Sequence, residues 1–301
     1  MDFTSFDGKR LCVHEWKDVN EPVGVVQIAH GMNEYAERYD AFARRLNRLG
    51  YVVVAEDHRG HGGTDPDTLG YCSGDMFGDT LKDMAYLSEA QRKKYPGIKY
   101  ILFGFSYGSF LAQAFVERYP RFLDAAIIAG SSRQNGAAVR AGLAISSLAC
   151  ALKGESAPAE FVNGLVFGGY DKKVGGEPSS WLSVDEESNR RYREDALCTF
   201  VCSNHFFRCF FRGLSRLYTK EGAAGLDPSL PLLLISGAED PVGGEKGVER
   251  LYDFYKKQGV KNVQKYLIAD SRHEFLNERR NFEEAFSVIS SFLKGVGVRK
   301  K

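Results

Sequence analysis

The segment Gly104-Phe105-Ser106-Tyr107-Gly108 constrains the fold more than any other part of the sequence. It follows an apolar run at residues 100–103 and leads into a helix-like stretch at residues 109–117. This is the pattern of a nucleophile elbow, a sharp strand-to-helix turn whose flanking glycines avoid clashes that a Cβ would cause. The turn presents the Ser106 hydroxyl, and the helix N-terminus beneath it favours developing negative charge. Because Gly-x-Ser-x-Gly alone is a weak motif, the chain must also supply a base, an acid and an oxyanion hole.

Apolar runs that read as strands alternate with helix-like segments on both sides of this turn. The strand-like runs are residues 23–28, 51–55, 100–103, 125–129, 232–235 and 263–268, and the helix-like segments are residues 39–49, 80–94, 109–117, 244–257 and 282–293. Strands that are apolar on both faces favour a parallel sheet covered by helices on both sides. Residues 3–16 instead alternate apolar and polar side chains around Asp7-Gly8, which predicts a hairpin at one sheet edge. The predicted fold class is therefore α/β.

One long segment interrupts this alternation. Residues 133–225 contain helix-like stretches and glycine-rich loops but no strand-like run of the same kind. We therefore predict a core formed by residues 1–132 and 226–301, with residues 133–225 inserted after a core strand. Loops at the carboxyl ends of parallel strands carry the chemistry in such folds, so the insertion is predicted to be a helical cap, or lid.

Composition narrows the possible partners and the compartment. The chain has 301 residues and a net charge of +1, so no overall field recruits nucleic acid. Residues 1–10 do not resemble a secretory signal, and six cysteines without a Cys-x-x-Cys pair indicate reduced thiols. The longest apolar segment, residues 137–152, contains Arg140 and is shorter than the roughly 20 residues that cross a bilayer. A cytoplasmic protein is the expectation.

Two further post-strand residues complete a catalytic set with Ser106. A serine alcohol needs a neutral imidazole to accept its proton and an acid to orient that imidazole. His273 lies between the last predicted strand and the last predicted helix, which places it at the carboxyl end of the sheet. Asp240 also follows a strand, and Pro241 fixes a turn that suits a short side chain, with Glu239 as the alternative acid. We predict Ser106 as nucleophile, His273 as base and Asp240 as the orienting acid.

The oxyanion hole is predicted to use two backbone N–H groups. One belongs to Tyr107, which follows the nucleophile, and the other to Met32, in a loop where Gly31 permits close approach to the elbow. A second loop holds His58 and His61 beside acidic residues, which could suggest a metal site. Such loops more often support an active site through hydrogen bonds, so no metal is predicted.

Aromatic residues of the predicted cap are candidates for substrate contact. If residues 198–212 form one helix, it is apolar nearly all round and needs apolar neighbours on both sides. Its Cys/His face is too long to bind one ion, because a helix rises about 1.5 Å per residue. The aromatics either pack the cap onto the core or line a channel for an acyl chain. With Phe105 beside the nucleophile, the candidate substrate-binding residues are Phe161, Phe167, Trp181, Phe206, Phe207, Phe210 and Phe211.

Several motifs together resemble one known family. The motifs are His30-Gly31-x-x-Glu34-x-x-x-Arg38-Tyr39, Asp57-His58-Arg59-Gly60-His61-Gly62, the elbow at Ser106, Gly237-x-x-Asp240-Pro241 and His273-Glu274. Over about residues 8–295 the chain resembles the monoacylglycerol lipase and lysophospholipase branch of the α/β-hydrolase superfamily, often labelled serine aminopeptidase-like. The nucleophile–acid–base order is also that of the α/β-hydrolase triad. The chain departs from the family at Tyr35, Phe105 and Tyr107, where His, His and Met are common.

The resemblance implies the α/β-hydrolase fold and a serine hydrolase that works through an acyl-enzyme, without a metal or organic cofactor. The implied substrate is a carboxylic ester with an apolar acyl chain, such as a monoacylglycerol or lysophospholipid. Transient contact between the cap and a membrane surface accompanies such substrates. Two alternatives stay open: an amidase or aminopeptidase-like hydrolase, and a non-catalytic ligand-binding protein on a hydrolase scaffold.

Overall fold

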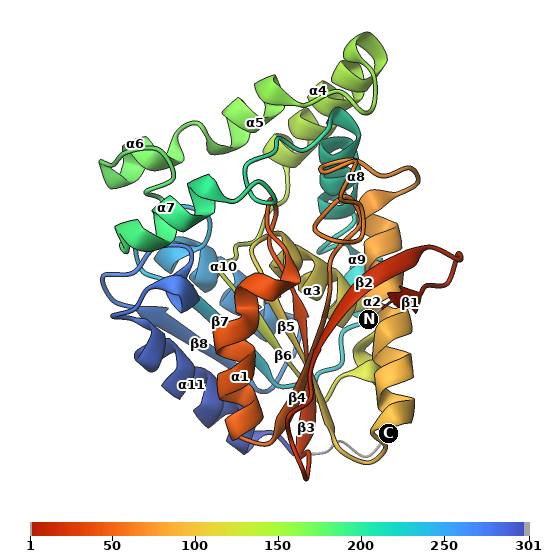
Figure 1. Ribbon diagram of the computed structural model, residues 1–301, viewed down its shortest axis with the longest axis vertical. Helices are drawn as coiled ribbons and strands as arrows, with labels where there is room; N and C mark the ends of the chain where they lie inside the picture. Colours follow the sequence, from red (N-terminus) through yellow and green to blue (C-terminus); the bar gives the residue numbers. More distant parts are fainter. Residues whose placement is uncertain (1, 298–301) are drawn as a thin grey trace.

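The structure is a computed structural model that describes residues 2–297, and Figure 1 shows a sheet with helices around it. Within that range, eight strands form one sheet in the order β1-β2-β4-β3-β5-β6-β7-β8. The strands are β1 (Asp2–Thr4), β2 (Arg10–Trp16), β3 (Gly24–Ala29), β4 (Tyr51–Glu56), β5 (Lys99–Phe105), β6 (Ala125–Ala129), β7 (Leu232–Gly237) and β8 (Val263–Ile268). The pairs β1–β2 and β2–β4 are antiparallel and the other neighbours are parallel. The sequence-based prediction of a mostly parallel sheet is confirmed.

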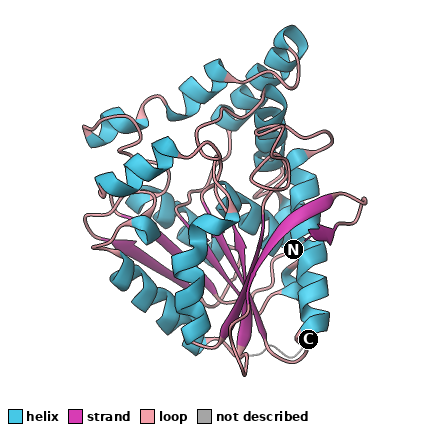
Figure 2. Ribbon diagram, in the orientation of Figure 1, coloured by secondary structure: helices cyan, strands magenta, loops and turns pink. Residues whose placement is uncertain are grey.

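Helices cover both faces of this sheet (Figure 2). The helices of the core are α1 (Asp40–Arg48), α2 (Met76–Lys94), α3 (Tyr107–Arg118), α10 (Gly244–Lys257) and α11 (Phe282–Gly295), with 3-10 turns η1 (Ala36–Tyr39), η2 (Pro120–Phe122) and η3 (Phe275–Asn277). Because side chains alternate along a strand, Val26 and Val53 pack with α1 and α11, whereas Val25 and Val52 pack with α2, α3 and α10. Strands β3 to β7 are thus buried on both faces, as their continuous apolar runs predict, whereas β2 and β8 are partly exposed.

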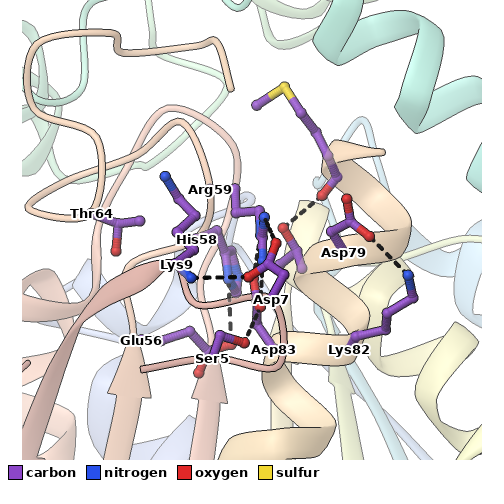
Figure 3. A network of polar contacts seen from close by, with 12 residues as sticks. Ser5, Asp7, Lys9, Glu56, His58, Arg59, Thr64, Asp79, Lys82 and Asp83 are labelled. Atoms are coloured by element: carbon purple, nitrogen blue, oxygen red, sulfur yellow. Dashed lines mark hydrogen bonds and ion pairs between the residues drawn. The ribbon is translucent and has the colours of Figure 1, made fainter. Parts of the chain in front are cut away.

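The hairpin of β1 and β2 is fastened to the core by a buried arginine. Figure 3 shows Arg59 between Asp83 of α2 and Asp7 of the hairpin turn. Its guanidinium donates to both oxygens of Asp83 at 2.6 and 2.8 Å and to Asp7 at 2.8 Å. The Ser5 hydroxyl also donates to Asp83. The Asp83 carboxylate of α2 therefore binds the hairpin both directly, through Ser5, and indirectly, through Arg59.

The predicted insertion, residues 133–225, follows β6. Its helices are α4 (Ala137–Lys153), α5 (Glu160–Phe167), α6 (Tyr170–Val174), α7 (Glu186–Glu194), α8 (Asn204–Ser215) and α9 (Lys220–Ala224). Helices α4 to α8 lie above the carboxyl ends of the parallel strands, at the top of Figure 1, and α4 packs against α8. In the described part of the chain, no helix has the length and apolar character needed to cross a membrane.

One helix begins later than its sequence pattern predicts. The apolar run from Cys198 predicts a helix that includes Cys198 and Cys202, but α8 starts at Asn204. The Ser203 side chain accepts a hydrogen bond from the Phe206 N–H and so caps the helix there. Cys198 and Cys202 therefore lie in the preceding segment and do not share a helical face with Cys209.

Candidate active site

The turn between β5 and α3 has the backbone strain that the elbow motif predicts. Ser106 has φ 52° and ψ −118°, in the region of positive φ that residues with a Cβ rarely adopt. A Cβ on Gly104 would lie 2.4 Å from the Gly108 carbonyl oxygen, and one on Gly108 would lie 2.0 Å from the Ala29 oxygen. Both glycines are therefore required by contacts with backbone atoms, and the elbow is packed directly against the end of β3.

The three predicted catalytic side chains form one hydrogen-bonded chain. His273 Nε2 lies 2.8 Å from Ser106 Oγ, and His273 Nδ1 lies 2.9 Å from Asp240 Oδ2. The imidazole, whose side chain is 2% exposed, joins a buried carboxylate to a partly exposed hydroxyl. Asp240, rather than the alternative Glu239, faces the imidazole, because Glu239 is exposed and its carboxylate lies 3.7 Å from the Arg272 guanidinium.

Asp240 is held as an anion by the groups around it. Burial alone would raise its pKa, but adjacent His273, the backbone N–H of Val242 and the hydroxyl of Ser236 hold the pKa below its usual value. The Val242 N–H donates to Oδ1 at 2.8 Å and the Ser236 hydroxyl donates to Oδ2 at 2.9 Å. The carboxylate is thereby oriented toward Nδ1, the arrangement that leaves Nε2 available to accept a proton from Ser106.

The loop after β3 lies against the elbow. A Cβ on Gly31 would be 3.2 Å from the Ser106 Cβ, so only glycine permits this approach without a shift. His30 fixes the loop, since its Nδ1 donates to the Gly31 carbonyl oxygen at 2.8 Å and its Nε2 accepts from the His58 N–H at 2.9 Å. Complete burial and the neighbouring histidines lower the pKa of His30, so the ring is neutral and serves both contacts. Met32 and Tyr107 line the same cavity as Ser106.

A buried ionic network connects this loop to the segment that carries the imidazole. Arg38 donates to Glu34 at 2.8 Å and to both oxygens of Glu274, the residue after His273, at 2.9 and 2.8 Å. Glu34 also accepts from the Gly31 N–H and from the Tyr39 hydroxyl. These residues belong to the sequence motifs, but the motifs predict no role for them. The four-residue spacing of Glu34 and Arg38 could have indicated their ion pair. The contact between Arg38 and Glu274 could not be predicted, because the two residues lie far apart in the sequence.

An apolar cavity of about 390 Å³ opens on one side of Ser106. Core residues form its base and α4, α5 and α8 of the insertion form its walls. Its lining includes Met32, Ser106, Tyr107, Phe110, Val139, Gly142, Ile145, Val162, Leu165, Val166, Phe167, Tyr170, Phe210, Phe211 and Leu214. The wall is mostly aliphatic and aromatic, and it reaches the nucleophile directly.

A second cavity, of about 280 Å³, also reaches Ser106 and shares Met32 and Phe167 with the first. Its lining is more polar and includes Asn33, Glu34, Asn163, Ser179, Tyr192, Thr199, His273 and Glu274. Phe105 of the core and Trp181 of the insertion also line it. Their ring centroids lie 4.7 and 5.0 Å from the centroid of the His273 ring. These two aromatics thus enclose the imidazole.

The predicted substrate-contacting aromatics divide into two groups. Phe105, Phe167, Trp181, Phe210 and Phe211 line one or both cavities. The described lining of either cavity does not include Phe161, Phe206 or Phe207. Phe161, on α5, is 63% exposed. Phe206 and Phe207 are buried residues of α8, and the centroid of the Phe206 ring lies 5.0 Å from that of Tyr107. Phe206 and Phe210 are four residues apart, as are Phe207 and Phe211, and each pair shares a face of α8. Position along the helix therefore separates them: Phe210 and Phe211, one turn later, line the cavity, whereas Phe206 packs on the core.

A mostly parallel sheet covered on both faces, with a serine elbow after β5, a carboxylate after β7 and an imidazole after β8, defines the α/β-hydrolase class. Residues 20–280 match the family model described as serine aminopeptidase, S33, and the chain belongs to this family.

Known proteins resemble the chain over most of its length. It is 27% identical to human monoglyceride lipase over 253 residues, which are 84% of this chain and 77% of that protein. The structure of a thermostable carboxyl esterase from Bacillus coagulans superposes with a TM-score of 0.88 at 26% identity, over 98% of this chain and 97% of the esterase. A lipase in an open form gives a TM-score of 0.88 at 25% identity, over 99% and 98% of the two chains.

Proposed function

We propose that this protein is a serine hydrolase that cleaves carboxylic esters with apolar acyl chains, of the monoacylglycerol or lysophospholipid class. One observation carries the proposal: the Ser106–His273–Asp240 chain of hydrogen bonds stands where an apolar and a more polar cavity meet. An ester with an apolar tail and a polar alcohol has the same two-part character. The lipase and esterase names of the relatives agree with this chemistry.

In the proposed reaction, Ser106 Oγ attacks the ester carbonyl carbon while His273 Nε2 accepts the hydroxyl proton. The negative charge on the carbonyl oxygen is stabilised by the N–H groups of Met32 and Tyr107, each contributing about 3 kcal/mol. His273 then donates the proton to the departing alcohol, which leaves an acyl-enzyme. Water repeats the sequence, with His273 again as base, and releases the carboxylic acid. Asp240 stabilises the imidazolium at both stages.

The two cavities suggest how the substrate is oriented. We place the acyl chain in the cavity lined by Phe110, Phe210 and Phe211, where burying each methylene is worth about 0.8 kcal/mol. The alcohol portion then occupies the cavity with Asn33 and Thr199, whose side chains can hydrogen-bond hydroxyl groups.

The insertion also suggests where a lipid substrate enters. Leu148 and Leu152 of α4 are 59% and 75% exposed, and Phe161 and Leu165 of α5 are 63% and 59% exposed. Leu165 also lines the apolar cavity, so exposed apolar side chains lead toward the nucleophile. We propose that this face of the insertion touches a membrane or micelle surface transiently while substrate is taken up.

The assignment is tested by Ser106→Ala and His273→Ala. Each should lower kcat/KM for p-nitrophenyl esters by at least about 10⁴-fold, because the two side chains act as one unit. A fluorophosphonate should label the wild type and leave Ser106→Ala unlabelled, while circular dichroism shows that both variants fold. Ester turnover within tenfold of wild type in either variant would refute the mechanism, and an unlabelled wild type would favour a non-catalytic binding protein.

The substrate class is tested separately with a chain-length series of p-nitrophenyl esters and monoacylglycerols, beside aminoacyl amides. We expect kcat/KM to rise with acyl length beyond short chains and amide turnover to be low. The carboxylates lining the polar cavity, Glu34 and Glu274, are bound to Arg38 and offer no free partner for an amine terminus. An optimum at two to four carbons would contradict the lipid substrate, and faster amide turnover would favour the amidase alternative.

A further inference from the structure

Three side chains of metal-ligating type converge at the edge of the sheet, away from the proposed catalytic groups. Cys12 and His14 are alternate residues of β2 and therefore project from the same face. The β2–β4 register pairs Val13 with Glu56, and the Asp57 N–H donates to the Cys12 carbonyl oxygen at 2.9 Å. Asp57 thus lies opposite Cys12 just beyond the end of β4, and one donor atom from each of the three residues falls within 4.8 Å of the others.

The distances have the proportions of a coordination shell. His14 Nε2 lies 3.5 Å from Cys12 Sγ and 3.4 Å from Asp57 Oδ2. With the usual bond lengths to sulfur, nitrogen and oxygen, a tetrahedral zinc ion separates sulfur from nitrogen by about 3.6 Å and nitrogen from oxygen by about 3.4 Å. Two edges of such a tetrahedron are therefore already present.

Hydrogen bonding alone explains this arrangement poorly. The same nitrogen, Nε2, faces both the thiol and the carboxylate, so the three groups cannot form a relay that uses the two ring nitrogens in turn. The nitrogen–oxygen separation of 3.4 Å is also longer than the roughly 2.8 Å of a charge-assisted hydrogen bond between imidazolium and carboxylate. A cation between the three donors would use the lone pair of Nε2 and satisfy all three.

We propose that Cys12, His14 and Asp57 bind a zinc ion. A thiolate, a neutral imidazole and a carboxylate supply two negative charges, which balance those of Zn²⁺, and the Cys12 proton is released to solvent on binding. Calcium and magnesium prefer shells of oxygen donors, so the sulfur and nitrogen ligands select against them. Water occupies the fourth position, since the His14 side chain is 23% exposed and Cys12 is only partly buried.

The carboxylate of Asp57 is positioned in advance by its surroundings. Its Oδ1 accepts from the Ala36 N–H at 2.8 Å, and its Oδ2 accepts from the Gly63 N–H at 2.7 Å. The side chain is 2% exposed. Backbone donors of this kind orient ligating carboxylates in metal sites and reduce the ordering that binding requires. Asp57 therefore needs little rearrangement, and the proposed ion would connect β2 to the loop that follows β4.

The test uses cobalt and zinc on the purified 301-residue chain after treatment with a chelator. Cobalt should produce a thiolate-to-metal charge-transfer absorption in the wild type, and zinc should displace it at one equivalent. Cys12→Ser should abolish that absorption, and both Cys12→Ser and His14→Gln should weaken zinc binding measured by calorimetry about 100-fold or more. Thermal melts of the metal-free proteins verify folding, and zinc should raise Tm only in chains that retain the site.

A matched control comes from a second thiol–imidazole pair. Cys209 Sγ also lies 3.5 Å from a histidine nitrogen, Nε2 of His205, but that nitrogen contacts the Gly74 carbonyl oxygen at 2.6 Å instead of a carboxylate. Cys209→Ser should retain the cobalt absorption and the zinc affinity of the wild type. The proposal is overturned if Cys12→Ser keeps the charge-transfer band, if Cys209→Ser loses it, or if zinc binds the wild type no more tightly than His14→Gln.

Discussion

At the scale of single residues, the site combines a strained serine with carboxylates whose charge is set by their neighbours. Ser106 keeps a positive φ because glycines and β3 leave the elbow no relaxed alternative. Asp240 is buried yet anionic because His273, Val242 and Ser236 all favour its charged form. The geometry around His273 is therefore fixed before any substrate arrives, which is the condition for rapid proton transfer.

Asp240→Asn tests the orienting role of this carboxylate. The amide keeps the shape but removes the charge that stabilises the imidazolium, so kcat for ester hydrolysis should fall about 10³–10⁴-fold without loss of fold. Steady-state kinetics and a thermal melt measure the two effects. Glu239→Gln is the matched control, because its exposed carboxylate should be replaceable without loss of rate. Equal losses in both variants would show that Asp240 has no special role.

Glu117 of α3 should make stability depend on pH. Burial raises its pKa to about 7, and of its two oxygens only Oε1 accepts a hydrogen bond within residues 2–297, from the Tyr218 N–H at 3.0 Å. The folded state therefore retains a proton that the unfolded chain loses above its ordinary pKa of 4.5. The contribution of Glu117 to the free energy of unfolding therefore falls as pH rises between these two values, by at most about 1.4 kcal/mol per pH unit. Above about pH 7 this contribution no longer changes with pH.

Glu117→Gln removes this titration and keeps an acceptor for the Tyr218 N–H. We expect the variant to gain stability relative to the wild type as pH increases from 5 to 8, by about 2 kcal/mol. Urea denaturation at each pH measures the difference. A constant difference between the two proteins across this range would mean that Glu117 titrates normally.

The candidate catalytic residues could be predicted because each follows a recognisable strand in the sequence. Asp240 and His273 lie in the loops that follow β7 and β8, and parallel strands bring their carboxyl ends to one edge. The group formed by Cys12, His14 and Asp57 could not be predicted in this way. It depends on the antiparallel register of β2 against β4, and no motif spacing encodes that register.

At the scale of elements, a clear apolar pattern determines which segments could be located in advance. Strands β6 and β8 and helix α10 have the bounds that their patterns predict. Strand β6 is buried along its whole length and α10 has one buried face, whereas β8 is the last strand of the sheet and is exposed at residues 264–266. Helix α8 was misplaced because its upstream residues are equally apolar without being helical. The capping hydroxyl of Ser203 decides the start, and a single serine in an apolar run is a weak signal.

The attachment of the hairpin to α2 gives a prediction at this scale. Asp83→Asn would leave the buried Arg59 guanidinium with one partner fewer, and breaking such a pair costs about 3 kcal/mol. Urea denaturation should show this loss. Lys93→Gln, near the other end of α2, removes an exposed pair with Glu89 and should cost about 0.5 kcal/mol or less. Similar losses in the two variants would show that the Arg59 network (Figure 3) does not secure the hairpin.

At the scale of the whole molecule, the proposed acyl cavity is formed jointly by the core and the insertion. Phe110 comes from α3 of the core, whereas Val139, Val162 and Phe211 come from three helices of the insertion. The aromatic content of residues 133–225 predicted a contact surface. It could not predict which side chains reach the cavity, because that depends on the rotation of α8 against α4 and the core.

Phe211→Ala should therefore alter chain-length preference. Phe211 is only partly buried and lies on the wall of the apolar cavity. Its removal should therefore lengthen that cavity without leaving a void in the hydrophobic core. Each additional methylene admitted adds about 0.8 kcal/mol, roughly a fourfold gain in kcat/KM for longer esters. The ratio of rates across the ester series measures the shift. Leu152→Ala, at an exposed position of α4 outside that wall, should leave the preference for monomeric substrates unchanged.

The meeting of two cavities at Ser106 also bears on what the acyl-enzyme can react with. An acyl chain held in the apolar cavity leaves the polar cavity free once the first alcohol has departed. Another small alcohol can enter there and compete with water for the acyl group, because His273 would deprotonate either one. We therefore expect added glycerol to divert part of the product from free acid to new ester, so that the same chain serves as an acyltransferase whenever alcohol is abundant.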